Sequence, residues 1–528
     1  MTDDTRLSRV QALTANARNT WFILLAVLIF VGVTMLGVRP IDFYGVSRDT
    51  ELPLVGVSVP TRLFFYTAPI LTVAVYGYFH LYLVRLWDAL GELPESIKDR
   101  RLGDAVTPWL ITDTALTLRR HLRKDGCCQP RALEFPSVFW NIVFAWLAGP
   151  VVLLYVWFQS LPARDLALTG VAAAMFVFSL IFGLGSAMMI FYRMRGGAGD
   201  PAHQVKKAGF LSALIGTLAA LPIGALSWLV TERPGHYLAR LDLTAENIVE
   251  RPAGWLPYEI ARNEFLVVWC KREEETPCTL IGLDEPQRKA FNNEWWARHR
   301  TLLADMNRPL WEREGADRPN FNNAILRLVF LAGANMRGED YLLRGTILTR
   351  AQLEGANLRK VTMKDVVLRG VRMARANMTR STLEDVDLQG ALLDDAIFRN
   401  AEMVRVQLRG AFMNGTDLNG SVNNGGLLRN IDLTAVVFDK RTDFRNVFLD
   451  GTVQLPEGFQ NQMGHPCQWV DQDLDDEAFF GRWRGWIEAA PPEYAPPAWE
   501  QIAPDDYKDT SAIPPPPGCT WKTGPLPQ

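Results

Sequence analysis

A five-residue period runs from Leu326 to Leu449 and constrains the fold of this 528-residue chain more than any other feature. In the longest uninterrupted run, from Leu343 to Phe438, the central residue of each unit is apolar at nineteen of twenty positions, and only Asn423 departs. The residue two before the centre is mostly small or β-branched, and the other three are mostly polar or charged. A period of five fits neither the about 3.6 residues of a helical turn nor the two of a strand. It predicts a solenoid in which every unit forms one side of a coil.

The best-formed units share the order alanine, asparagine, large apolar residue: Ala334-Asn335-Met336, Ala356-Asn357-Leu358 and Ala376-Asn377-Met378. This order resembles the motif A-(D/N)-L-x-x of the pentapeptide-repeat family, and the resemblance covers roughly a quarter of the chain. It implies a right-handed β-helix with four sides. The central residue and the residue two before it are expected to point inward, and the other three to face solvent. About 25 units, at four per coil, would give about six coils and a rod of about 30 Å.

Five segments within the first 230 residues contain no Asp, Glu, Lys or Arg: residues 21–38, 63–84, 138–160, 166–192 and 208–230. Each is about long enough for a helix to cross a hydrocarbon core of ~30 Å. The first has no small-x-small cleavage site before Arg39, which favours a signal anchor over a cleavable signal peptide. The predicted fold class is therefore an α-helical transmembrane bundle of about five spans followed by a right-handed quadrilateral β-helix.

The order of a bundle and repeats, together with short motifs in the bundle, also resembles a family of membrane-anchored bacterial proteins with pentapeptide repeats. The motifs are Phe43-Tyr44-Gly45-Val46, Leu52-Pro53-Leu54, Phe64-Phe65-Tyr66 with Pro69, His80-Leu81-Tyr82-Leu83, Leu93-Pro94 and Pro108-Trp109-Leu110. This resemblance implies an architecture and no established activity.

Basic residues predict the orientation of the bundle. The N-terminal tail and the connections after the second and fourth segments hold sixteen Lys and Arg, and the alternate connections hold six. Because cytoplasmic loops are enriched in basic residues, the N-terminus is expected in the cytoplasm of a multi-pass protein of a bacterial inner membrane. After five spans the β-helix would lie in the periplasm.

Six cysteines provide an independent check on this compartment. Cys270 and Cys278 bracket a short polar stretch, and Cys467 and Cys519 flank the C-terminal region. Pairing 270 with 278 and 467 with 519 is the simplest of three connectivities, and disulfides persist outside the cytoplasm. Unpaired buried thiols remain an alternative. Cys127 and Cys128 lie in the connection that is predicted to be cytoplasmic, where thiols stay reduced.

The composition divides the chain into four parts: 1–234 as transmembrane domain, 235–320 as linker and cap, 321–454 as β-helix, and 455–528 as a flank with a Pro-rich tail. Residues 239–248 look like an early, degenerate repeat, and Trp295 and Trp296 are expected to cover the open end of the β-helix, because a solenoid needs a cap. Residues 479–486 are aromatic and basic. They either pack against the β-helix or bind a partner.

No catalytic, cofactor-binding or metal-binding motif appears, so we predict a protein that is not an enzyme and has no cofactor. A channel or transporter is one alternative, although the spans hold no ionisable residue beyond His80. A gyrase-protecting DNA mimic, known among soluble members of the family, is another, but residues 339–440 contain 13 acidic and 14 basic residues.

The preferred function is a membrane-anchored scaffold that binds a protein partner, with homo-oligomers as an open alternative and no nucleic acid expected. The predicted interaction surface consists of basic and aromatic residues: Arg359, Lys360, Arg369, Arg372, Arg375, Arg380, Trp483, Arg484 and Trp486.

Overall fold

The chain forms two compact units in a computed structural model, Met1–Phe43 with Arg48–Ala239 and Tyr44–Ser47 with Arg240–Gln528. The structure describes residues 3–46, 49–52, 56–97, 99–130, 134–196, 201–232, 240–274, 278–280, 282–312, 318–464, 466–491, 503 and 505–519. The finer division at residues 234, 320 and 454 stays a prediction.

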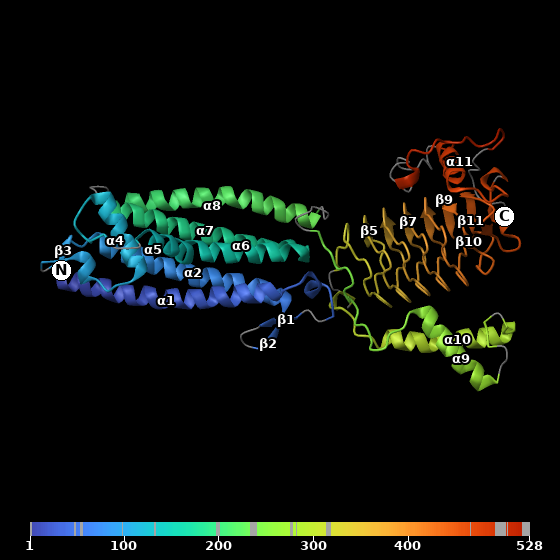
Figure 1. The fold of residues 1–528 in the computed structure, drawn as a ribbon, viewed down its shortest axis with the longest axis horizontal. Coiled ribbons are helices and arrows are strands. Elements are labelled where there is room, and N and C mark those ends of the chain that lie inside the picture. Colours follow the sequence, from blue (N-terminus) through green and yellow to red (C-terminus); the bar gives the residue numbers. More distant parts are fainter. Residues whose placement is uncertain are drawn as a thin grey trace. The chain divides into compact units, whose positions relative to one another are not determined.

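The first unit consists mainly of long helices (Figure 1). Its elements are α1 (Asp3–Gly37), β1 (Asp49–Leu52), β2 (Val57–Pro60), α2 (Thr61–Gly91), β3 (Ser96–Ile97), β4 (Arg100–Arg101), α3 (Leu102–Ala105), α4 (Leu110–Arg123), α5 (Glu134–Asn141), α6 (Ala148–Ser160), α7 (Leu166–Arg195) and α8 (Pro201–Glu232). Five stretches are long and apolar enough to cross a membrane: Asp3–Gly37, Thr61–Gly91, Glu134–Ala163, Leu166–Arg195 and His203–Thr231. They coincide with the five segments singled out from the sequence, except that the first ends at Gly37 and not at residue 38, so the predicted apolar helices are confirmed.

The third apolar stretch contains a π-helical turn, Ile142–Leu147, between α5 and α6. Pro150 has no N–H to donate to the carbonyls one turn before it, which explains the irregular hydrogen bonding. The hydroxyl of Tyr76 on α2 donates instead to the carbonyl oxygen of Trp146 at 2.9 Å. Gly149 and Gly183 make room for this tyrosine, because a Cβ atom at either position would lie within 2.6 Å of its side chain.

The second unit contains a parallel β-helix. One side is a six-stranded sheet of β5 (Leu342–Arg344), β6 (Thr362–Lys364), β7 (Thr382–Glu384), β8 (Glu402–Val404), β9 (Val422–Leu428) and β11 (Asp443–Leu449), stacked in this order (Figure 1). Leu343 pairs with Met363, and Met363 pairs with Leu383, so each coil takes 20 residues, or four five-residue units. The predicted β-helix of about six coils is confirmed.

The four faces of the β-helix are named here in chain order by their central residues. Face 1 carries the strands around Leu343, Met363, Leu383 and Met403. Face 2 contains Leu348, Leu368, Leu388 and Leu408, face 3 contains Leu353, Met373, Leu393 and Met413, and face 4 contains Leu358, Met378, Phe398 and Leu418. These central residues are buried throughout, as expected.

The outward positions are less free than the sequence pattern indicates. The residue two after the centre has a positive φ in most units, as at Lys360 and Arg380, and several units place glycine there. The residue before the centre, where it is Asn or Asp, accepts a hydrogen bond from the N–H two residues later: Asn377 Oδ1 from Thr379 and Asp417 Oδ1 from Asn419. These bonds satisfy turn amides that point away from the neighbouring coil.

Asn423 occupies the inward central position in β9, opposite Met403, although the sequence suggests a loop or bulge there. The segment is a strand, and the irregularity appears as a shifted register between β9 and β11. Both polar side-chain atoms of Asn423 are buried without a hydrogen-bond partner in the described part of the chain.

Residues ahead of the repeats extend the β-helix by part of a coil. Asp242 and Asn247 form parallel bridges with Ile325 and Phe330, which confirms the early repeat. The helices that follow, α9 (Tyr258–Glu273) and α10 (Glu285–Ala304), lie along the side of the β-helix (Figure 1). The prediction that Trp295 and Trp296 cover its open end is therefore wrong, because α10 docks on face 3.

The C-terminal flank packs on the β-helix through α11 (Asp476–Glu488). The short strands β10 (Ile431–Asp432) and β12 (Val453–Gln454) pair with each other in parallel. Trp483 and Trp486 are 1% and 2% exposed and pack in a cluster with Leu427 and Phe448 of the β-helix. The prediction that these two tryptophans belong to an interaction surface is therefore wrong, because their indole rings are buried.

Candidate interaction surface

Face 3 is covered by the pair α9–α10. Arg372 pairs with Glu259 at 2.7 Å, and the Tyr258 hydroxyl bridges Arg375 and Asp395 at 3.1 and 3.0 Å. The guanidinium group of Arg375 also lies 4.6 Å from the ring centre of Trp296. Arg372 and Arg375 thus hold the helix pair and are not an open basic surface.

Under this cover lie two buried ionisable groups that the sequence analysis did not single out. His299 is surrounded by the rings of four aromatic residues: Trp255, Tyr258, Trp295 and Trp296. Burial and the nearby Arg375 lower the pKa of His299 to about 4. Burial raises the pKa of Glu354 to about 8, with a further contribution from Glu259. Both side chains are therefore largely uncharged at neutral pH.

Face 2 is partly covered near its C-terminal end. Asp476, at the start of α11, forms ion pairs with Arg409 and Arg429, and it accepts a hydrogen bond from Tyr507 at 2.8 Å. Arg369, which was predicted as surface, lies on the open part of face 2 and pairs with Asp387. Arg484 contacts Glu488 and the carbonyl oxygen of Thr510 within the flank itself.

Face 1 is open but largely neutralises its own charge. Arg405 binds Glu384 at 2.9 Å and Asp385 at 2.6 Å, and Lys364 binds Glu384 at 2.9 Å. The two cations hold the pKa of Glu384 below its usual value. This ladder joins neighbouring coils and leaves little net charge for a partner.

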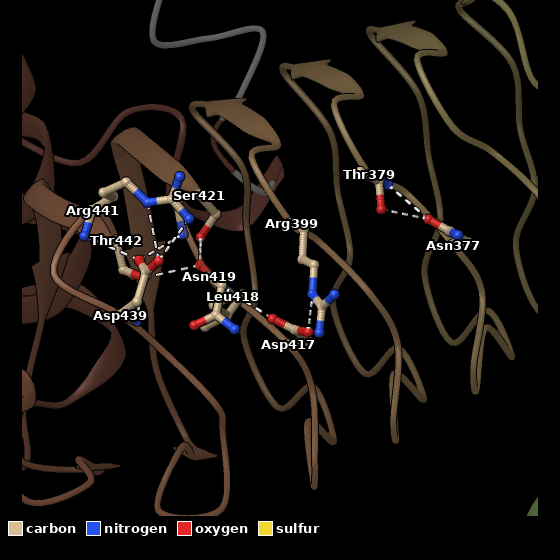
Figure 2. A network of polar contacts seen from close by, with 11 residues as sticks. Asn377, Thr379, Arg399, Asp417, Leu418, Asn419, Ser421, Asp439, Arg441 and Thr442 are labelled. Atoms are coloured by element: carbon tan, nitrogen blue, oxygen red, sulfur yellow. Dashed lines mark hydrogen bonds and ion pairs between the residues drawn. The ribbon is translucent and has the colours of Figure 1, made fainter.

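Face 4 is open and basic. Its outward positions from 335 to 420 hold five basic residues and one acidic residue, Asp417: Arg337, Arg359, Lys360, Arg380 and Arg399. Figure 2 shows the C-terminal part of this face, where Arg399 pairs with Asp417 and Asn377 bonds to Thr379. Lys360 pairs with Glu339 at the other end.

Three guanidinium groups of face 4, those of Arg337, Arg359 and Arg380, are exposed and form no ion pair with any residue that the structure describes. Arg359 and Arg380 belong to the interaction surface predicted from the sequence, whereas Arg337 and Arg399 do not. Reading the sequence in columns of 20 residues would have found Arg399, because it follows Arg359 by two coils on the same face. Arg337, Arg359, Arg380 and the paired Lys360 and Arg399 are called the face 4 cations below.

The four cysteines of the second unit form the two expected pairs. Cys270 and Cys278 lie at bonding distance with Cα atoms 5.7 Å apart, and Cys467 and Cys519 with Cα atoms 5.6 Å apart. Cys127 and Cys128 are free. Among the described residues, no group of three or more His, Cys, Asp or Glu side chains lies close enough to hold a metal ion.

Comparison with known families identifies the repeats. Residues 346–385 and 382–420 match the family model described as pentapeptide repeats, in eight copies. No curated protein sequence matches the chain significantly.

Several solved structures are similar over part of the chain. QnrB1, a plasmid-mediated fluoroquinolone resistance protein, is 14% identical, and the match covers 31% of this chain and 89% of that chain with a TM-score of 0.20. Rfr23 from the cyanobacterium Cyanothece is 22% identical, with 25% and 90% covered and a TM-score of 0.14. HetL from Nostoc, which is involved in regulating heterocyst differentiation, is 16% identical, with 29% and 78% covered and a TM-score of 0.13. The matched repeats and the coils described above show that the β-helix of this chain is built from pentapeptide repeats, and it follows a unit that contains five long apolar helices.

Proposed function

We propose that this protein is a membrane-anchored scaffold that presents face 4 of its β-helix to an acidic surface of a partner protein. The observation that carries the proposal is the contrast between the faces. Face 3 and part of face 2 bind the chain's own helices, and face 1 balances its own charge. Face 4 keeps three exposed guanidinium groups without an ion pair among the described residues.

Physical reasoning favours a protein partner for such a face. Stacked coils fix the arginine side chains at a regular spacing, so little backbone order has to be gained on binding. Guanidinium groups bind carboxylates through two parallel hydrogen bonds, and complementary charge gives specificity and a faster association. A duplex mimic would need an acidic face, and the charge of face 4 has the opposite sign.

The membrane part of the proposal is supported by the apolar helices, the distribution of basic residues and the cysteine pairs. A further point comes from within the second unit, to which Tyr44 belongs. The carbonyl oxygen of Tyr44 accepts a hydrogen bond from Trp311 at 3.1 Å, and its ring lies 5.5 Å from that of Phe321. Tyr44 follows the first apolar helix and Trp311 follows the fifth. The two segments must share one side of a membrane, as they do with five spans.

The partner can be tested by site-specific photo-crosslinking in cells. A photoreactive amino acid replaces Thr379 on face 4 or, as a matched control, Thr349 at the equivalent position of face 2. We expect a discrete crosslinked partner only from position 379, and its loss in the double variant Arg359→Glu, Arg380→Glu. Arg350→Glu, also exposed but on face 2, should leave the crosslink intact. Identical products from both positions, or a product insensitive to the charge reversal, would refute the proposal.

The orientation is tested separately with a membrane-impermeant thiol reagent on single-cysteine variants. Reagent added to spheroplasts reaches the periplasmic side of the inner membrane. Reagent added to inverted inner-membrane vesicles reaches the cytoplasmic side. A β-helix that reacts only from the cytoplasmic side would contradict the periplasmic placement without affecting the argument about face 4.

A further inference from the structure

An apolar cleft lies between α4, the segment from α5 to α6, and α7 in the first unit, with a volume of about 530 Å³. Its deep end is lined by Trp146, Pro150 and Leu180, and its other end by Thr117, His121 and Ile190. The volume falls within the roughly 300–1,000 Å³ of small-molecule sites in proteins. The irregular turn around Pro150 and the small residues Gly183 and Ala187 keep this space from being filled by side chains.

The length of the cleft matches one leaflet of a membrane. Its wall on α7 runs from Leu180 to Ile190, and ten residues of helix at about 1.5 Å each span about 15 Å. This is about half of a hydrocarbon core of ~30 Å. Ile142 is 44% and Leu147 is 49% exposed at the mouth, so the cleft opens sideways.

The polar end of the cleft coincides with the basic end of two helices. Arg123 of α4 donates hydrogen bonds to the carbonyl oxygens of Met194 and Arg193 at 2.9 and 2.7 Å, which holds the C-terminal ends of α4 and α7 together. Next to this junction, Lys124 and Arg195 form no ion pair with any described residue. His121 lines the cleft itself.

Three carboxylates lie near this end, and each is paired with an arginine: Glu134 with Arg120, Asp125 with Arg119 at 2.9 Å, and Asp88 with Arg193 at 2.6 Å. Glu134 accepts a hydrogen bond from Thr117 at 2.8 Å and forms an ion pair with Arg120 at 2.5 Å. The end of the cleft therefore keeps a net positive charge from Lys124 and Arg195, whereas its depth is apolar.

We infer that this cleft binds one phospholipid, with an acyl chain in the groove and the phosphate at His121, Lys124 and Arg195. Water would form few hydrogen bonds in so apolar a space, and an empty groove would lack dispersion contacts. A hydrocarbon chain in the groove supplies these contacts. The basic end supplies the attraction for the phosphate. The inference rests on the proposed membrane insertion, but it is independent of any partner of face 4.

Native mass spectrometry of the full chain in a mild non-ionic detergent tests the inference, with delipidated protein titrated with palmitoyl-oleoyl phosphatidylglycerol. Wild type is expected to retain one lipid. Ala187→Trp fills the cleft and should weaken binding by at least about tenfold, since losing two buried methylene contacts suffices for that change. Ala174→Trp places the same residue at an exposed site on the same helix and should bind as wild type does.

A second variant keeps the test decisive if Ala187→Trp fails to fold. His121→Asp changes an exposed side chain at the polar end and should weaken lipid binding several-fold, with an unchanged thermal midpoint. Equal lipid retention by wild type, Ala187→Trp and His121→Asp would overturn the inference. A wild type that retains no phosphatidylglycerol, while remaining folded, would overturn it as well. Loss of the face 4 crosslink with lipid binding intact would bear only on the proposed scaffold function.

Discussion

Replacement of Glu354 by glutamine should remove most of the loss of folding stability that the β-helix unit shows as pH rises. Glu354 is fully buried on face 3, and its two carboxylate oxygens form no hydrogen bond to any other described residue. Burial raises its pKa to about 8, Glu259 adds to this effect, and Arg372 and Arg251 oppose it. Glutamine has nearly the same shape but cannot ionise, so the substitution isolates the charge.

The sign follows from proton binding. A carboxyl group whose pKa is higher in the folded state binds more protons there, so stability falls as pH rises. The loss begins above the ordinary value of 4.5 and is complete above about 8. The difference between the two values, at about 1.4 kcal/mol per pH unit, gives an upper bound of about 5 kcal/mol. Opening of α9–α10 that admits water to the site would reduce the loss of stability to about half of this bound.

Thermal unfolding of the full chain in detergent, followed between pH 5 and pH 9, measures the effect. A loss of about 2 kcal/mol corresponds to a midpoint lower by roughly 3 °C for a unit of this size. We expect this fall in wild type and a nearly flat curve for Glu354→Gln. Glu339→Gln, at an exposed site on the same β-helix, should behave as wild type does. If the midpoints of wild type and Glu354→Gln fall in parallel as pH rises, Glu354 does not have the raised pKa that its burial implies.

Three other perturbations follow from the structure. Asn423→Leu should stabilise the β-helix by about 1–3 kcal/mol in thermal or denaturant unfolding, because it replaces a buried unpaired amide in the apolar column; a lower midpoint would contradict this. Cys467→Ser should cost about 4 kcal/mol under oxidising conditions, since the pair with Cys519 closes a loop of 52 residues; equal midpoints with and without reductant in wild type would show that the pair contributes nothing. Gly183→Leu should disrupt packing of the first unit against Tyr76, with a lower midpoint in detergent; a wild-type midpoint would mean that the tyrosine can move aside.

The repeat fold was predictable because the pattern is local and recurs. The apolar residues of every unit indicate which positions point inward, and a coil of 20 residues follows once four units are assigned to each turn. The apolar helices were predictable for a similar reason, since length and the absence of charge suffice. Both are properties of short windows of sequence, and the structure contains them at the expected positions.

The distribution of open faces was not predictable, because it depends on where non-repeating segments dock. Arg372, Arg375 and Arg359 occupy similar outward positions in the repeat, yet the first two hold α9 and the third is exposed. Glu354 also has an outward position, which in an isolated coil would face water. The burial of this residue is a consequence of the helix pair, and no residue in the repeat itself indicates it.

The docking of α9–α10 on face 3 therefore includes an unfavourable free energy of burial that is absent from the β-helix alone. An outward repeat face is polar and needs no partner, yet Glu354 and His299 are both buried in uncharged forms here, and His299 lies among aromatic rings. Such burial destabilises the docked state unless the contacts of Tyr258 and the aromatic cluster compensate for it. The same docking engages Arg372 and Arg375, so the basic residues of face 3 are not open to a partner. The pair leaves face 4 open with three exposed guanidinium groups that form no ion pair with a described residue, compared with two, those of Arg327 and Arg350, on face 2.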